Sequence, residues 1–151
     1  MLRWSVAAIH LLALGIGLGA VWARRRALLG ALDAPGLSRI FTADNWWAVS
    51  ALLWITTGVA RAFGGLDKGT AYYVHNDLFL AKMACFALIF ALEIRPIVTL
   101  IRWRNAARRG QSVDTRAAPA LARISAVQTA LVILMVLLAT GMARGFGARS
   151  G

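Results

Sequence analysis

Four long apolar segments dominate this sequence and limit what it can fold into. They cover about residues 4–23, 46–63, 77–101 and 122–143. A transmembrane helix needs roughly 20 mostly apolar residues, and each segment has about that length. The chain is 60% hydrophobic with a mean hydropathy of +0.67, whereas soluble domains are usually about 45–50% apolar. The sequence therefore predicts an all-α integral membrane protein, in which residues 1–151 form a single bundle of four transmembrane helices.

Positive charge is concentrated between the apolar segments. The loops predicted at residues 24–45 and 102–121 carry four and five arginines, whereas the loop at residues 64–76 has only Lys68. Because loops rich in Lys and Arg stay in the cytoplasm, we expect both of these loops inside and both termini outside. The formal net charge of +11 fits this arrangement and contact with anionic lipid headgroups. We therefore expect the lipid bilayer, and not nucleic acid, as the partner.

An eight-residue pattern occurs twice. The sequence Thr-Gly-x-Ala-Arg-x-Phe-Gly ends the second segment at residues 57–64 and recurs at residues 140–147. Upstream, residues 37–40 resemble residues 121–124, with a shift of one residue relative to the eight-residue pattern. The repeat predicts two copies of one helical hairpin, related by a pseudo-twofold axis along the membrane normal. Parallel repeats of this kind occur in transporters, and they also suit a plain duplicated bundle.

Several ionisable side chains are predicted at one level, in the outer half of the bundle. This group consists of His10, Arg61, His75, Asp77, Lys82 and Arg144. Ionisable residues at membrane depth are costly and therefore often mark functional sites. Imidazole can bind haem iron or another metal, and arginine can pair with the propionates of haem. We therefore predict a cofactor site for haem b formed by His10, Lys82, Arg61 and Arg144, or a metal site with His10 and His75 as ligands.

The same residues also fit structural roles. In that interpretation His10 hydrogen-bonds to a neighbouring helix, and Lys82 pairs with Asp77 or reaches the interface. The arginines of the group extend to the lipid headgroups, as long basic side chains do near helix ends.

Two other features of the apolar segments have alternative interpretations. Glu93 either pairs with one of the cytoplasmic arginines or begins a proton or ion path toward Lys82. Gly15 and Gly19 form a GxxxG step, which lets a second helix approach closely. That step serves packing within the bundle or a homo-oligomer or other membrane partner.

Short stretches along the chain resemble an uncharacterised bacterial family of predicted membrane proteins, a domain of unknown function. They are Ala8 to Ala13, Thr57-Gly58 with Arg61, Lys68-Gly69-x-x-Tyr72-Tyr73-x-His75-Asn76, Lys82-Met83 and Arg95-Pro96-x-x-Thr99. A weaker resemblance links His10 and Lys82 to the HemJ-type protoporphyrinogen oxidases and the CopD-type copper-resistance membrane proteins. In the HemJ type, a histidine of the first helix and a lysine early in a later helix are associated with haem. This second resemblance therefore implies a haem- or metal-binding role.

These observations lead to three functional hypotheses. The first is a protein of the bacterial inner membrane with no assigned reaction and with the predicted haem or metal site. The second is a small transporter or permease component that uses Lys82 and Glu93, and the third is a structural subunit without a site. The sequence contains no Ser-His-Asp set, P-loop or dinucleotide-binding fingerprint, so it predicts no particular enzymatic reaction.

Overall fold

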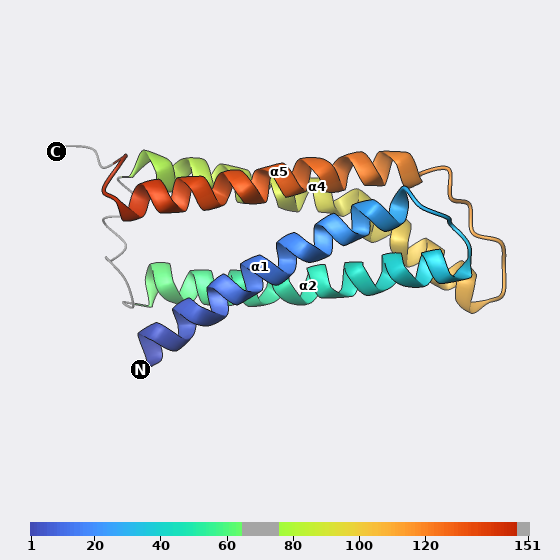
Figure 1. The fold of residues 1–151 in the computed structure, drawn as a ribbon, viewed down its shortest axis with the longest axis horizontal. Coiled ribbons are helices and arrows are strands. Elements are labelled where there is room, and N and C mark those ends of the chain that lie inside the picture. Colours follow the sequence, from blue (N-terminus) through green and yellow to red (C-terminus); the bar gives the residue numbers. More distant parts are fainter. Residues whose placement is uncertain (65–75, 148–151) are drawn as a thin grey trace.

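The computed structural model describes residues 1–64 and 76–147, and this part of the chain is a bundle of four long helices. The helices are α1 (Leu2–Leu28), α2 (Ala34–Phe63), α4 (Asp77–Arg108) and α5 (Ala118–Ala143). They lie side by side along the long axis of the molecule, with α1 crossing α2 at an angle (Figure 1). At 1.5 Å per residue each helix is about 40–48 Å long. The prediction of an all-helical bundle is confirmed.

Three of these helices have the length and apolar character needed to cross a membrane. They are α1, α4 and α5. The second predicted span, residues 46–63, lies in the second half of α2, so the structure places a helix there, and its crossing of the bilayer stays a prediction. Large apolar side chains are exposed on the outside of the bundle, among them Leu12, Leu52 and Leu137. An apolar outer surface of this kind suits contact with lipid.

The predicted loops are shorter in the structure than the charge pattern suggested. The connection between α1 and α2 covers only residues 29–33, and that between α4 and α5 covers residues 109–117. Asp33 begins α2 by accepting a hydrogen bond from the backbone N–H of Gly36 at 2.8 Å, which satisfies a free donor of the first helical turn. The arginines near residues 24–26 and 39 therefore lie on helices, and the interpretation of them as loop residues was wrong.

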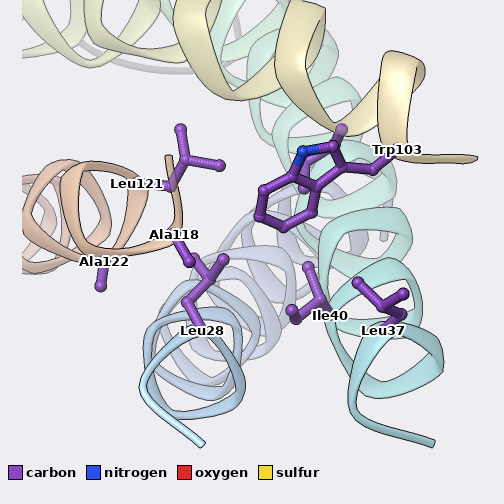
Figure 2. Close-up of a cluster of buried hydrophobic side chains, with 8 residues drawn as sticks. Leu28, Leu37, Ile40, Trp103, Ala118, Leu121 and Ala122 are labelled. Carbon is purple, nitrogen blue, oxygen red and sulfur yellow. The ribbon is translucent and has the colours of Figure 1, made fainter. Parts of the chain in front are cut away.

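Two apolar clusters form the core. The loop-end cluster lies where the two short connections are, and the central cluster lies further along the bundle. In Figure 2 the indole of Trp103 extends from α4 toward Leu28 of α1 and Ile40 of α2. The buried members of the loop-end cluster are Leu28, Leu37, Ile40, Leu100, Trp103, Ala118, Leu121 and Ala122. Those of the central cluster are Ala20, Val21, Trp47, Ile89, Val132 and Met135.

The two copies of the repeat occupy the same end of the bundle. Residues 57–64 end α2 and residues 140–147 end α5, and both helices finish at the end where α1 and α4 begin (Figure 1). In each copy the glycine faces the first helix of its own hairpin. A Cβ added to Gly58 would lie 3.4 Å from His10, and one added to Gly141 would lie 3.1 Å from Leu78. The hairpins α1–α2 and α4–α5 thus use equivalent glycines for equivalent close contacts.

Candidate functional site: a buried charged layer

Arg24 is a fully buried arginine near the end of α1, with an exposed fraction of 0%. Its Nε donates a hydrogen bond to Ser125 Oγ at 3.2 Å. Its Nη1 donates to Asp44 Oδ1 at 2.8 Å and to Glu93 Oε1 at 2.7 Å. Its Nη2 donates to Glu93 Oε2 at 3.0 Å and to Gln128 Oε1 at 2.8 Å. A guanidinium has five N–H donors, and all five are used here.

The two carboxylates that hold Arg24 come from different hairpins. Glu93 on α4 forms the bidentate pair, a geometry that joins a planar guanidinium and a carboxylate strongly. Asp44 on α2 uses its other oxygen to accept from Arg104 Nη2 at 2.9 Å. Arg104 also donates to the backbone oxygen of Phe41 at 3.2 Å, and its guanidinium lies 4.8 Å from the centre of the Phe41 ring.

Gln128 completes the contacts from α5. Its amide nitrogen donates to Glu93 Oε2 at 2.6 Å and to the backbone oxygen of Ile89 at 3.3 Å. Gln128 and Ser125 are both fully buried. Every buried side-chain nitrogen and oxygen within residues 1–64 and 76–147 has a hydrogen-bond partner. Buried polar groups are costly unless they are paired, and this arrangement leaves none unpaired in that part of the chain.

We call this set the charged layer, and it joins all four helices. Its members are Arg24, Asp44, Glu93, Arg104, Ser125 and Gln128. On each helix a member of the layer falls between the two apolar clusters, as at Val21, Arg24 and Leu28 of α1, whereas Arg104 directly follows Trp103 of the loop-end cluster. Two arginines and two carboxylates give it no net charge. Apolar packing on both sides lowers the local dielectric, which strengthens these ion pairs and raises the cost of breaking them.

The charged layer follows the internal repeat. Asp44 lies seven residues after Leu37, and Gln128 lies seven residues after Leu121. Leu37 and Leu121 are both buried in the loop-end cluster. In this register, which is shifted by one residue from that of the Thr-Gly motif, Asp44 and Gln128 are equivalent positions of the two hairpins, and both accept a hydrogen bond from Arg24. The layer is thus located at the interface between the repeats.

His10 is held by two residues of α2. The indole nitrogen of Trp54 donates to Nε2 of His10 at 3.0 Å, so this nitrogen carries the lone pair. In the neutral ring, Nδ1 then carries the proton, and it donates to Thr57 Oγ1 at 2.8 Å. Thr57 in turn donates to the backbone oxygen of Leu53. The structure confirms the expected hydrogen bond from His10 to a neighbouring helix. Binding of iron at Nε2 would require the loss of the Trp54 contact.

The other residues of the predicted haem or metal site have different environments. Lys82 is half-buried in the second turn of α4, and Arg61 is half-buried near the end of α2. Arg144 is exposed just after α5, and His75 lies outside the described residues. Within residues 1–64 and 76–147 there is no group of three or more His, Cys, Asp or Glu side chains that could hold a metal. The haem and metal assignments stay predictions.

The structure settles two of the alternatives. Glu93 pairs with an arginine of the first Arg cluster, as one of them predicted, and that arginine is Arg24. The prediction that Gly15 and Gly19 serve packing within the bundle was wrong, because a Cβ added to either glycine meets nothing within 4 Å. Gly17 makes the close approach instead, since its added Cβ would lie 3.2 Å from Ser50. A homo-oligomer through Gly15 and Gly19 stays a prediction.

These features define the class of the protein: a helical integral membrane protein with an apolar outer surface and a buried charged layer. The chain belongs to the family described as Predicted membrane protein (DUF2214), which matches residues 2–147. That description names no activity. Neither the curated proteins nor the solved structures include a significant match to the chain.

Proposed function

We propose that the protein is a small proton-linked transporter or permease component of the bacterial inner membrane, with α2 as its fourth span and both termini outside. The observation that carries this proposal is the position of the charged layer, which lies at the interface between two repeated hairpins. In transporters built from repeats, substrate and coupling-ion sites occur at the repeat interface. Ionisable residues within transmembrane helices often mark proton and ion pathways.

Glu93 is the residue on which we expect the coupling proton to bind. Its carboxylate accepts hydrogen bonds from both Arg24 and Gln128, so it links the α4–α5 hairpin to α1. A proton on Glu93 would neutralise the carboxylate and weaken its pair with Arg24, which would keep Asp44 as its remaining anionic partner. Apolar clusters lie on both sides of the layer, and the Glu93 side chain is only 14% exposed, so access of a proton to Glu93 is narrow and would change when the hairpins move relative to each other.

The proposal is tested in liposomes that contain the purified protein and an internal pH-sensitive dye. We expect an imposed pH gradient to collapse faster than in empty liposomes, and we expect Glu93→Gln to abolish the difference. Asp114→Asn is the control variant, because Asp114 is an exposed loop acid paired with Arg116. Equal rates with and without protein, or an unchanged rate in Glu93→Gln, would contradict proton coupling at this residue.

A structural subunit is the second candidate, and one observation favours it. All five N–H groups of Arg24 are already donated to protein atoms, which is the arrangement expected of a fixed joint between helices. In that case the parent protein would show no proton flux in liposomes, and Glu93→Gln would only lower its stability in detergent. The liposome and stability measurements together therefore distinguish the two functions.

The haem hypothesis has its own test. Protein purified after expression with ample haem would show a Soret absorption band if His10 were an iron ligand, and His10→Ala would remove that band. Parent protein without a Soret band would contradict this hypothesis, while the proton-flux proposal would be unaffected.

A further inference from the structure

A groove of about 770 Å³ runs along the outside of the bundle between α1 and α2. Its floor is made of small residues, among them Gly19, Ala20, Ala23 and Ala43. A Cβ added to Gly19 would meet nothing within 4 Å, so the space above the floor is open. The groove extends from Gly30 at the loop end to Ile16, which corresponds to about 20 Å along α1.

Two arginines and two tryptophans lie along the sides of this α1–α2 groove. Arg26 on α1 and Arg39 on α2 line its loop-end part, together with Ser38. Trp22 and Trp46 line it further along, and 47% and 55% of their surfaces are exposed. Tryptophan is enriched at the level of lipid headgroups. The groove therefore has a cationic polar end, an aromatic zone and an apolar trench, in that order.

The charges of the groove are not balanced by the protein within residues 1–64 and 76–147. There the four ion pairs use Arg24, Arg104 and Arg116, and neither Arg26 nor Arg39 forms one. The groove thus lacks a carboxylate, and the charge complementary to it is negative. A ligand that fits must carry an anionic group at one end and an apolar chain at the other.

We propose that the α1–α2 groove binds one anionic phospholipid. Its phosphate pairs with Arg26 and Arg39 and accepts a hydrogen bond from Ser38, while an acyl chain lies in the trench over Gly19 and Ala23. Arginine pairs well with phosphate oxygens because its N–H groups match them geometrically. The polar end lies near the connection at residues 29–33 between α1 and α2, where the headgroups of the adjacent leaflet are expected. This site is separate from the charged layer and does not depend on proton transport.

The test is native mass spectrometry of the full chain released from nanodiscs with equal amounts of phosphatidylglycerol and phosphatidylcholine. We expect one retained phosphatidylglycerol per chain in the parent protein. An arginine near anionic headgroups contributes about a factor of five in affinity, so Arg26→Gln with Arg39→Gln should weaken retention about 25-fold. The control is Arg108→Gln with Arg109→Gln, which removes the same charge from exposed arginines at the end of α4, and it should retain the lipid.

A second variant tests the apolar part of the groove. It keeps the proposal testable if the variant without Arg26 and Arg39 fails to fold. Gly19→Leu places a side chain in the groove at a position where an added Cβ meets nothing within 4 Å, and it should displace the lipid while leaving helicity and thermal unfolding unchanged. Three outcomes would overturn the proposal: retention unaffected by both variants, equal retention of phosphatidylcholine, or a dimer of the chain that carries no lipid and is lost in Gly19→Leu. The last outcome would assign the groove to a second copy of the protein.

Discussion

Replacement of Arg24 by methionine is the sharpest test of the charged layer. Methionine keeps an unbranched apolar stem, though a shorter side chain, and removes the charge and all five donors. Glu93 then keeps only the hydrogen bond from Gln128, whereas Asp44 keeps its pair with Arg104. The main cost is therefore one largely buried carboxylate without a cation, since the Glu93 side chain is 14% exposed. Breaking a buried ion pair by removing one partner costs about 3–5 kcal/mol, and we expect a loss near the lower end because Asp44 is still paired.

The measurement is unfolding in mixed micelles with increasing sodium dodecyl sulfate, followed by circular dichroism. Arg26→Met is the matched control, because Arg26 is exposed on the same helix and surface substitutions usually change stability by less than about 0.5 kcal/mol. The double variant Arg24→Met with Glu93→Met removes both charges. Replacing a whole buried pair by apolar residues is often neutral, so the double variant should recover at least about 2 kcal/mol. If Arg24→Met were as stable as Arg26→Met, the layer would contribute nothing to the bundle.

Two further predictions follow from close contacts and from a loop ion pair. Gly17→Leu should destabilise the bundle by about 1–3 kcal/mol because the new side chain overpacks against Ser50, whereas Gly15→Leu should unfold at the same detergent concentration as the parent. A hydrogen bond from Arg116 lowers the pKa of Asp114 to about 2 from a usual value of 3.8. The stabilising effect of this pair is therefore present above pH 3.8 and is lost as the pH falls through about 2. Titration of the Asp114 carboxyl carbon by NMR checks this value, and Arg116→Gln should return it toward 3.8.

The helices could be predicted from the sequence because hydrophobic segments of about 20 residues have few other solutions in a membrane. The ends of the helices could not be predicted, because the Arg-rich stretches were interpreted as loops. In the structure α1 continues through its arginines to Leu28. α2 already begins at Ala34, well before the predicted span. The positive-inside pattern reports the side of the membrane, and it does not report where a helix stops.

Arg24 was missed for the same reason, although the sequence contains a signal for it. Buried residues of α1 include Ala13, Gly17, Ala20, Arg24 and Leu28, with spacings of three and four residues that keep one helix face toward the core. Arg24 is on this face and its two arginine neighbours are not. Extending the face of the apolar segment into the Arg cluster would have singled it out.

Tryptophans show the same limit of reasoning from position along a segment. Trp47 and Trp103 lie near the ends of apolar segments, where an interfacial aromatic belt is typical, but both are buried, with exposed fractions of 6% and 4%. Trp47 packs 5.8 Å from the guanidinium of Arg24. A tryptophan near a segment end faces lipid or the core according to its helix face, and only the packing of the other helices decides which.

The repeat has a consequence for how a bundle like this can arise. Two identical hairpins that associate about a twofold axis must bring identical side chains to equivalent positions, so an arginine near the axis would face a second arginine. In a single chain the two halves can differ. Here Asp44 has a neutral amide, Gln128, as its equivalent, and Glu93 gives the buried Arg24 its second anionic partner. Joining the hairpins into one polypeptide is thus what permits a charged interface with one central arginine, because a symmetric pair of separate chains would always contain two.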